Sequence, residues 1–457
     1  MSIEEKIRFI DDNAFKLQEQ LGDFLRIKSV STDKRFSKSC ERAADWLVTQ
    51  LQALKFHVKA HKTEGHPIVL AHAGEGSPHL LFYGHYDVQP ADPLEAWDTN
   101  PFEPKIKMTA NGNAIFARGA SDDKGQLMTF VNACNAFLKI DGKLPCKITL
   151  IIEGEEETGS PSIEQFMTAN RSVLNADYAL VCDTSMWDNK TPAITTTLRG
   201  MLGEEINLKT ALKDLHSGIY GGGVLNPIKE LSKAIASLHD ASGRVMINDF
   251  YKGVPETPKI IKNQWKKLNF STENFLTEVG LTSSVGEQSY SLLEQIWARP
   301  TCELNGIWGG YTAPGFKTVI PSEANAKVSF RLVGNQDPEK IRLEFRKHIK
   351  NQVHKDCKIN FIAKDGSKAI SVPIDSTIIK KAKNALLKEW GVAPVFVGSG
   401  GSIPIVGAFK EMLGLDTLLV GFGLEDDKIH SPNEKYDLRS YQKGAKSWIR
   451  ILSEITD

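Results

Sequence analysis

The sequence has no long hydrophobic segment and no excess of charge of either sign. None of its apolar runs reaches the roughly 18 residues of a membrane-spanning helix. Lysine plus arginine equals aspartate plus glutamate, at 56 each, and no Lys/Arg block stands out. No net field therefore draws the protein to nucleic acid or to an anionic membrane, and we expect neither as a partner.

Cysteine is scarce and scattered, with six residues and no CxxC pair. Cys134 lies in an apolar helical stripe, and Cys146 and Cys182 border strand-like runs. This pattern favours buried, reduced thiols over a disulfide framework or a zinc knuckle. The first residues, MSIEEKIRFIDDNAF, are acidic and helical, unlike a secretory signal. We therefore expect a cytoplasmic protein.

The length predicts two domains, because 457 residues exceed the roughly 250–300 at which a single hydrophobic core stops growing. In residues 1–197 and 372–457, short apolar runs alternate with helical segments, which indicates an α/β domain with a mainly parallel sheet and helices on both faces. The expected strands are 79–85, 146–153, 177–183 and 416–423, and the expected helices are 3–28, 39–55, 124–140, 376–389 and 437–455.

The intervening residues 198–371 have a different pattern. Residues 203–212 and 326–333 alternate polar and apolar side chains, as half-exposed strands do. Asn226-Pro227 is typical of a helix start, and a further helix begins near Pro338. We expect an inserted α+β domain here, which makes the first domain discontinuous.

Acidic residues and histidines gather where the expected strands end. Asp87 follows His85 by two positions, so its carboxylate can orient the imidazole, although an isolated pair of this kind is more typical of a solvated strand end. Asp122 and Asp123 lie in a strand-to-helix turn, where they could bind cations or simply form an acidic helix N-terminus.

Three further groups complete the pattern. Three consecutive glutamates, at 155–157, follow the strand 146–153 and repel one another unless a metal neutralises them or the loop is solvated. Asp183 and His430 each follow an apolar strand. Open α/β sheets bind cofactors at the carboxyl ends of their strands. Imidazole and carboxylate ligands without thiolate suit Zn²⁺ or Mn²⁺, and five ligands with one bridging carboxylate indicate a pair of cations about 3.5–4 Å apart.

Eight motifs occur in a recognisable order, namely YGHYDVQPAD, ARGASDDKGQ, EGEEETGS, LHSGIYGGGV, KTVIP, the arginine of SFRLV, GGSIPI and IHSPNE. Together they resemble the aminoacylase/carboxypeptidase/carnosinase family of two-metal metallopeptidases, and most nearly its cytosolic non-specific dipeptidase branch. The resemblance extends from about residue 80 to residue 440.

The resemblance implies a ligand set for two divalent cations, Zn²⁺ or Mn²⁺. His85 would bind one cation and His430 the other. Asp122 would bridge them and be joined to Asp123 by a cis peptide bond. Asp183 would complete the site of His85.

The same resemblance divides the acidic run into roles. The family's general base is the penultimate acidic residue and its ligand is the last, which makes Glu156 the base and Glu157 the ligand. Glu155 is then without a catalytic role. Asp87 belongs with the catalytic residues through its contact with the histidine. A hydroxide shared by the two cations would attack the scissile carbonyl.

The inserted domain is expected to act as a lid and to form a homodimer. In the family, a histidine at the position of His216 reaches the active site of the other subunit and stabilises the oxyanion. Arg331 alternates with apolar neighbours and would bind the carboxylate of a small peptide substrate. Thr318, Gly401 and Ser402 would help to seat that peptide.

The implied function is therefore an exopeptidase that hydrolyses dipeptides or short peptides. One alternative is an N-acyl amino-acid amidohydrolase with the same metals. Ser399 keeps it open, because the dipeptidase branch often has glutamate in this loop. A second alternative, from another class, is an inactive, dimeric metal-binding or regulatory protein.

Overall fold

The computed structural model describes residues 2–401 and 403–456, and these residues form two compact units. The first contains the chain up to Thr196, Val372–Val397 and the residues from Pro404 onward, and the second contains Thr197–Ser371 and Gly398–Ile403. The sequence placed Gly398–Ile403 with the first unit. This segment instead groups with the second, where the backbone N–H of Arg199 donates to the Ser399 carbonyl at 3.4 Å.

The central strands of the first unit are parallel, which confirms the predicted α/β class. The strand order is β1-β2-β6-β3-β7-β17-β8, and β16 also pairs with β8. Strands β6, β3, β7 and β17 are parallel, whereas β1, β2 and β8 pair antiparallel. The bounds are β1 His57–His61, β2 Ile68–Ala73, β3 His79–His85, β6 Lys147–Glu153, β7 Tyr178–Val181, β8 Ala193–Leu198, β16 Val395–Ser399 and β17 Asp416–Leu419.

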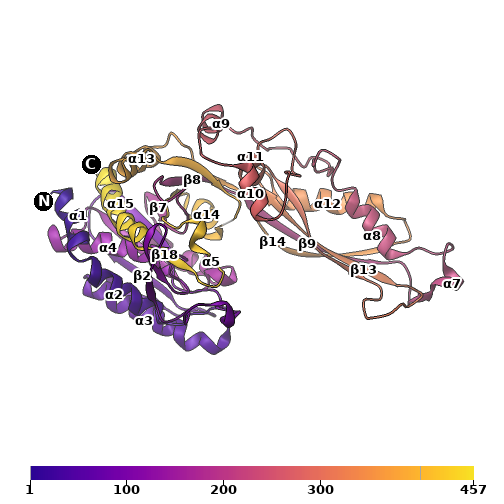
Figure 1. Cartoon of the computed structure of the whole chain (residues 1–457), viewed down its shortest axis with the longest axis horizontal. Coiled ribbons are helices and arrows are strands. Elements are labelled where there is room, and N and C mark those ends of the chain that lie inside the picture. The colour runs from indigo at the N-terminus through magenta and orange to yellow at the C-terminus, as the bar shows by residue number, and fades with distance from the viewer. Residues whose placement is uncertain (1, 402, 457) are drawn as a thin grey trace. The chain divides into compact units, whose positions relative to one another are not determined.

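Helices cover both faces of this sheet, as two adjacent residues of β3 demonstrate. On one face, the Phe82 ring stacks on Phe130 of α4 (Lys124–Ile140) at 3.8 Å and meets Trp448 of α15 (Leu438–Thr456) edge-on. On the other face, Tyr83 contacts Phe409 of the π-helical turn η4 (Phe409–Leu413). Helices α1 (Ile3–Asp12) and α13 (Thr377–Trp390) lie beside α15 (Figure 1).

The single helix predicted over residues 3–28 is wrong. The chain forms α1 and then α2 (Ala14–Leu25), with a break at Asn13, whose φ and ψ are −108° and 10°. The Asn13 side-chain amide donates to the Phe9 carbonyl at 2.9 Å, and the Asn13 backbone N–H donates to the same carbonyl at 3.2 Å. Such local side-chain-to-backbone hydrogen bonds are typical of asparagine at helix ends.

The remaining elements of the first unit include a small three-stranded sheet, ordered β18-β5-β4. The bounds are η1 Lys34–Phe36, α3 Ser37–Ala53, η2 Leu94–Ala96, β4 Lys105–Thr109, β5 Gly112–Phe116, η3 Glu156–Thr158, α5 Ile163–Ala169, α6 Arg171–Leu174, α14 Pro404–Ala408, η5 Glu425–Asp427 and β18 Lys435–Asp437.

The second unit contains a four-stranded antiparallel sheet, ordered β11-β13-β9-β14, with two helices on one face, in agreement with the predicted α+β pattern (Figure 1). The strands are β9 Gly200–Lys209, β11 Thr301–Gly309, β13 Glu323–Leu332 and β14 Lys358–Ser367, and the helices are α8 Pro227–Ala236 and α12 Pro338–Gln352. The shared core includes Leu202 and Ile206 of β9, Leu231 of α8, Phe330 of β13 and Phe345 of α12.

The strand alternation of β13 agrees with the sequence. Phe330 and Leu332 are fully buried on the helix-covered face, whereas Arg331 between them is partly exposed on the other face. The smaller elements are β10 Leu215–His216, α7 Ser217–Tyr220, α9 Lys259–Trp265, α10 Thr272–Glu278, α11 Leu292–Trp297, β12 Val319–Ile320 and β15 Ile370–Ser371.

All six cysteines are free, and all but Cys357 are buried, as predicted for reduced thiols. Among the described residues, no helix combines the length and the apolar character needed to cross a membrane.

Candidate active site

The structure brings five of the predicted site residues together in two groups that share one member. His85, Asp122 and Asp183 form the first group, and Asp122, Glu157 and His430 form the second. Within each group, one candidate ligand atom per residue lies within 4.8 Å of the others. Asp122 belongs to both groups, so its carboxylate is placed to join two neighbouring sites.

The parallel sheet explains this gathering. In the registers of β3, His85 lies beside Glu153 of β6 and Tyr83 beside Val181 of β7. These strands therefore end at the same edge of the sheet. Asp183 and the 155–157 turn follow directly after β7 and β6, so their carboxylates lie near the His85 imidazole.

Each oxygen of Asp122 faces a different histidine. The His85 Nε2 atom lies 3.0 Å from Asp122 Oδ1 and 3.9 Å from Asp183 Oδ2. On the other side, the His430 Nε2 atom lies 2.9 Å from Asp122 Oδ2 and 3.2 Å from Glu157 Oε2. Each histidine nitrogen therefore faces its own oxygen of the Asp122 carboxylate. A carboxylate placed in this way could bridge two cations.

Asp87 is buried and links the strand end at His85 to the glutamate turn at 155–157. Its Oδ1 and Oδ2 atoms accept hydrogen bonds from the backbone amides of Glu156 and Glu157, at 3.3 and 3.1 Å. The His85 Nδ1 atom lies 3.1 Å from the Asp87 carbonyl oxygen and 3.4 Å from Oδ1. Ser31 donates a further hydrogen bond to Oδ2. Asp87 therefore positions both the imidazole and the turn that carries the glutamates.

The turn at Asp122 and Asp123 does not serve as a carboxylate cap for α4. The peptide bond between the two residues is cis, as the resemblance implies. Asp123 occupies the cap position of α4 but makes no side-chain cap hydrogen bond. Its Oδ2 atom instead accepts from the backbone N–H of His85 at 3.1 Å. Asp123 thus stands at the start of α4, as expected for an acidic helix N-terminus, but its carboxylate also binds the end of β3.

One residue of this site was missed by the sequence reasoning. The buried carboxylate of Glu434 accepts hydrogen bonds from the backbone amides of Gly119, Ser121 and Asp122, at 2.9, 3.0 and 3.1 Å. Arg118 Nη1 donates to the same carboxylate at 2.7 Å. Glu434 thus holds the turn that carries Asp122. The signal was its place in IHSPNE, four residues after the candidate ligand histidine.

The site concentrates negative charge in a buried setting. Burial, with the neighbouring carboxylates Asp183 and Glu157, raises the pKa of Glu156 to about 8 against the opposing attraction of His85. Burial, followed by repulsion from Asp122, raises the pKa of Asp183 to about 7. For Asp122, burial is outweighed by hydrogen bonds from the two histidines, so its pKa is lowered.

No lysine or arginine of the described residues pairs with these acids. Among residues 2–401 and 403–456, the ion pairs of Asp122, Asp183 and Glu157 involve histidine alone. Buried carboxylates need a positive partner. A bound divalent cation is often the largest local charge in such a site. The donor atoms are carboxylate oxygens and imidazole nitrogens, a set that fits Zn²⁺ or Mn²⁺.

The predicted substrate residues lie in the second unit, apart from Ser402, which lies outside the described residues. His216 is exposed, and its Nδ1 atom accepts from the backbone N–H of Gly218 at 3.0 Å. The backbone N–H of Ser217 donates to the Thr318 carbonyl at 3.0 Å, and His216 of β10 pairs with Val319 of β12, so Thr318 lies beside the end of β10. Gly401 is exposed, and its N–H donates to Ser399 Oγ at 3.1 Å.

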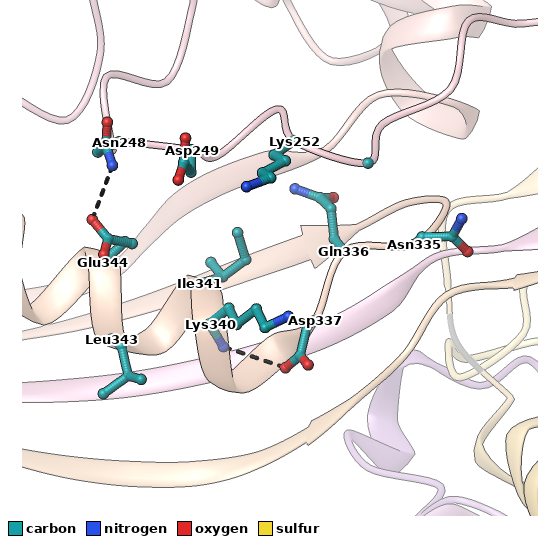
Figure 2. Close-up of a pocket in the computed structure, with 11 residues that line it drawn as sticks. Asn248, Asp249, Lys252, Asn335, Gln336, Asp337, Lys340, Ile341, Leu343 and Glu344 are labelled. Atoms are coloured by element: carbon teal, nitrogen blue, oxygen red, sulfur yellow. Dashed lines mark hydrogen bonds between the residues drawn. The ribbon is translucent and has the colours of Figure 1, made fainter.

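A cavity of about 340 Å³ in the second unit contains none of these residues (Figure 2). Its walls come from residues 248–253 and 335–344, and they carry lysines and carboxylates side by side. Asp337 accepts from the first backbone amides of α12, and the Asn248 amide donates to Glu344. These polar groups hold the wall together, and the cavity has no cluster of metal-ligating side chains.

Two imidazole–carboxylate groups around one shared aspartate, beside a further glutamate, define the class as a metal-dependent hydrolase. Comparison with known proteins gives the family. The sequence profile of peptidase family M20/M25/M40 matches residues 81–454, and the chain belongs to this family.

Individual relatives agree with this assignment over most of their length. The chain is 30% identical to the Cys-Gly metallodipeptidase dug1 of Schizosaccharomyces pombe, covering 100% of this chain and 98% of that one. It is also 30% identical to the human Beta-Ala-His dipeptidase, covering 85% and 77%.

A solved structure supports the fold independently. The M20 family metallo-carboxypeptidase Sso-CP2 from Sulfolobus solfataricus superposes with a TM-score of 0.83 at 31% identity, covering 96% of this chain and 99% of that one.

Proposed function

We propose that this metallopeptidase hydrolyses dipeptides, as an exopeptidase that requires a free carboxylate on its substrate. The observation that carries the proposal is the shared aspartate: Asp122 lies between His85 and His430, with Glu156 beside them. The relatives named for Cys-Gly and Beta-Ala-His dipeptidase activity support the same substrate class.

We assign two divalent cations, Zn²⁺ or Mn²⁺, to the two groups of ligands. His85 and Asp183 would hold one, Glu157 and His430 would hold the other, and Asp122 would join them. When bound, such cations polarise a carbonyl group and make water more acidic.

Glu156 is the general base in this proposal. It takes a proton from the attacking water and returns it to the leaving amine, which is general acid–base catalysis by one carboxylate. Burial and the neighbouring carboxylates raise the pKa of Glu156 above its ordinary value, and perturbed pKa values of this kind are common for groups in active sites. The backbone amide of Glu156 is fixed by Asp87, which keeps the base in place.

Residues 1–197 and 372–457, apart from Gly398–Ile403, would then form the catalytic part, and residues 198–371 with that segment a lid that binds substrate. Arg331 would bind the substrate carboxylate, with Thr318, Gly401 and Ser402 seating the peptide. His216 would stabilise the oxyanion in the site of a second subunit.

A homodimer through the second unit is part of the proposal. Strand β11 is one of the two edge strands of its sheet, and an open edge can pair with another chain. Apolar side chains on and after this strand are exposed, and they include Leu304, Ile307, Trp308 and Phe316. A second copy of the chain would cover them. The free, mostly buried cysteines support the expected cytoplasmic setting.

An N-acyl amino-acid amidohydrolase is the second candidate function. Ser399 favours it, because glutamate is frequent in this loop of the dipeptidase branch. The Ser399 hydroxyl accepts the N–H of Gly401 and therefore shapes the loop, where a glutamate would offer a charge to a substrate amine.

One assay tests both candidates. The purified chain, loaded with Zn²⁺ or Mn²⁺, is given dipeptides, N-acetyl amino acids and the C-terminal amides of the dipeptides. Hydrolysis of the free dipeptides, with weak activity on the other two sets, supports the proposal. Preference for the acylated set supports the second candidate, and no turnover with either metal contradicts both.

A further inference from the structure

A second arginine lies in the second unit beside elements with a proposed substrate role. Arg199 occupies the single position between β8 and β9. Its backbone N–H donates to the Ser399 carbonyl, and its Nε donates to the Gly400 carbonyl at 3.1 Å. A Cβ atom on Gly400 would lie only 2.9 Å from Arg199 Nη2, so glycine at this position permits the close approach.

The sheet register places Arg199 near Arg331. Arg331 of β13 lies opposite Met201 of β9, and both side chains point away from the face that α8 and α12 cover. Arg199 directly precedes β9 and lies two positions before Met201, which places it diagonally across from Arg331. The pKa of Arg199 agrees with this placement. Burial lowers the pKa to about 10, and repulsion by the positive charge of Arg331 is the next cause.

Neither guanidinium is neutralised. Within residues 2–401 and 403–456, no carboxylate forms an ion pair with Arg199 or Arg331, and the Arg331 guanidinium has no hydrogen-bond partner. Glu303 attracts Arg199 only from beyond ion-pair distance. Both arginines are partly buried. Two neighbouring, partly buried cations without a counter-ion form an incomplete arrangement that an anion would complete.

We propose that Arg199 and Arg331 together form a two-guanidinium site for the carboxylate of the peptide substrate, with Arg199 as an additional specificity-determining residue. This inference rests on the dipeptidase function proposed above. Arg199 is fixed through Nε to the Gly400 carbonyl, so its terminal nitrogens stay available for the ligand. A guanidinium that is already held loses less conformational entropy on binding than a free one.

The same contacts also connect Arg199 to the loop that is proposed to seat the peptide. The loop at Gly400 and Gly401 and the guanidinium of Arg199 are joined by hydrogen bonds, so the carboxylate site and the loop proposed to seat the peptide are one connected structure.

The test compares a dipeptide with its C-terminal amide on Arg199→Gln, Arg199→Lys and Arg331→Gln. Lys327→Gln is the matched control, since Lys327 is a cation on the same face of β13 that pairs with Glu205. The ratio of kcat/KM for the acid to that for the amide should fall about tenfold or more in both Arg199 variants, mainly through KM for the acid, because one charge-assisted interaction is lost. The ratio for Lys327→Gln should match that of the wild type.

A double variant gives an independent check. If both arginines bind one carboxylate, the loss in Arg199→Gln/Arg331→Gln should be smaller than the product of the two single losses. Binding of both peptides is also measured by calorimetry in the Glu156→Gln background, which separates affinity from turnover.

The outcomes distinguish this inference from the proposed function. If the Arg199 variants lose kcat/KM equally on the acid and the amide, the ratio is unchanged and the inference is overturned. Arg199 would then only support the Gly400 loop. A wild-type protein that hydrolyses no dipeptide contradicts the proposed function, and calorimetry then decides the role of Arg199: an affinity for the free acid that Arg199→Gln does not weaken overturns the inference.

Discussion

Asp87 Oδ1 accepts a hydrogen bond from the backbone N–H of Glu156 at 3.3 Å, while the same residue contacts the imidazole of His85. The proposed general base and one candidate ligand are therefore positioned by a single buried residue. Its two carboxylate oxygens are fully used, because Glu157 and Ser31 donate to the other one. The acidic turn is thus tied to the edge of the sheet.

The first prediction concerns which glutamate is the base. Glu156→Gln should reduce kcat roughly 10²–10⁴-fold with metal content unchanged, because the amide cannot accept the proton. Glu155→Gln is the matched control on the neighbouring residue. The Glu155 carboxylate lies against Gly65, where an added Cβ would be 1.7 Å from Oε1, and Glu155 belongs to neither ligand group. Steady-state kinetics and metal analysis check both, and a larger loss in Glu155→Gln would contradict the assignment.

The sequence predicted this site well where it depended on strand ends. Parallel strands of one sheet end at the same edge, so His85, Asp183 and the glutamate run could be placed together from the apolar runs that precede them. The choice of Glu157 rather than Glu156 as a ligand needed the resemblance, because position in an acidic run does not say which way a carboxylate points.

Other features depend on contacts between distant segments, which local patterns do not reveal. Glu434 is buried against Gly119 and Ser121, more than 300 residues earlier in the chain. The grouping of Gly398–Ile403 with the second unit depends on hydrogen bonds to Arg199. The break at Asn13 is local, yet the apolar spacing continues across it and hides it.

The second prediction is that cation binding depends on the shared aspartate. The wild-type chain should bind two equivalents of Zn²⁺ or Mn²⁺ and gain thermal stability, since a ligand at 100 times its Kd adds about 2.7 kcal/mol. Asp122→Asn should lose most of both equivalents and the stabilisation. Metal analysis and thermal unfolding, with and without chelator, measure this.

Two further variants make the metal experiment specific. His430→Ala should lose one equivalent and retain the other, because His85 and Asp183 belong to a separate group. Glu425→Gln is the control, as an exposed acid near the same histidine. Retention of two equivalents by Asp122→Asn would refute a bridging role.

The third prediction concerns the carboxylate that holds the Asp122 turn. Glu434→Ala should lower the free energy of unfolding by about 3–5 kcal/mol, because it leaves the buried Arg118 guanidinium without its partner. Arg118→Ala should be similarly costly. The double variant should cost clearly less than the sum, since neither charge is then left alone. Chemical denaturation measures all three, and strict additivity would show that the pair is not coupled.

The fourth prediction is that Arg331 binds its ligand through a planar fork. A guanidinium donates two parallel hydrogen bonds to a carboxylate, and a lysine ammonium cannot reproduce this geometry. Arg331→Lys should therefore lower kcat/KM on a free dipeptide about tenfold or more while metal content stays unchanged. Equal wild-type rates on acid and amide would show that the carboxylate is not bound.

The last prediction concerns the exposed histidine of the second unit. His216 belongs to the short β10–β12 pair, and its Nδ1 atom is occupied by the N–H of Gly218. Its Nε2 atom has no partner among the described residues and is available as a donor to an oxyanion. If it acts on a second subunit, His216→Ala and Glu156→Gln should each be inactive alone. Mixed with free subunit exchange, they should recover up to about a quarter of the wild-type activity, because half of the dimers contain one intact site. A His216→Ala/Glu156→Gln double variant mixed with wild type under the same conditions controls for exchange itself. If mass measurement proves that subunits exchange and no activity returns, His216 acts within its own subunit or outside catalysis. The proposed dimer would then have no role in catalysis.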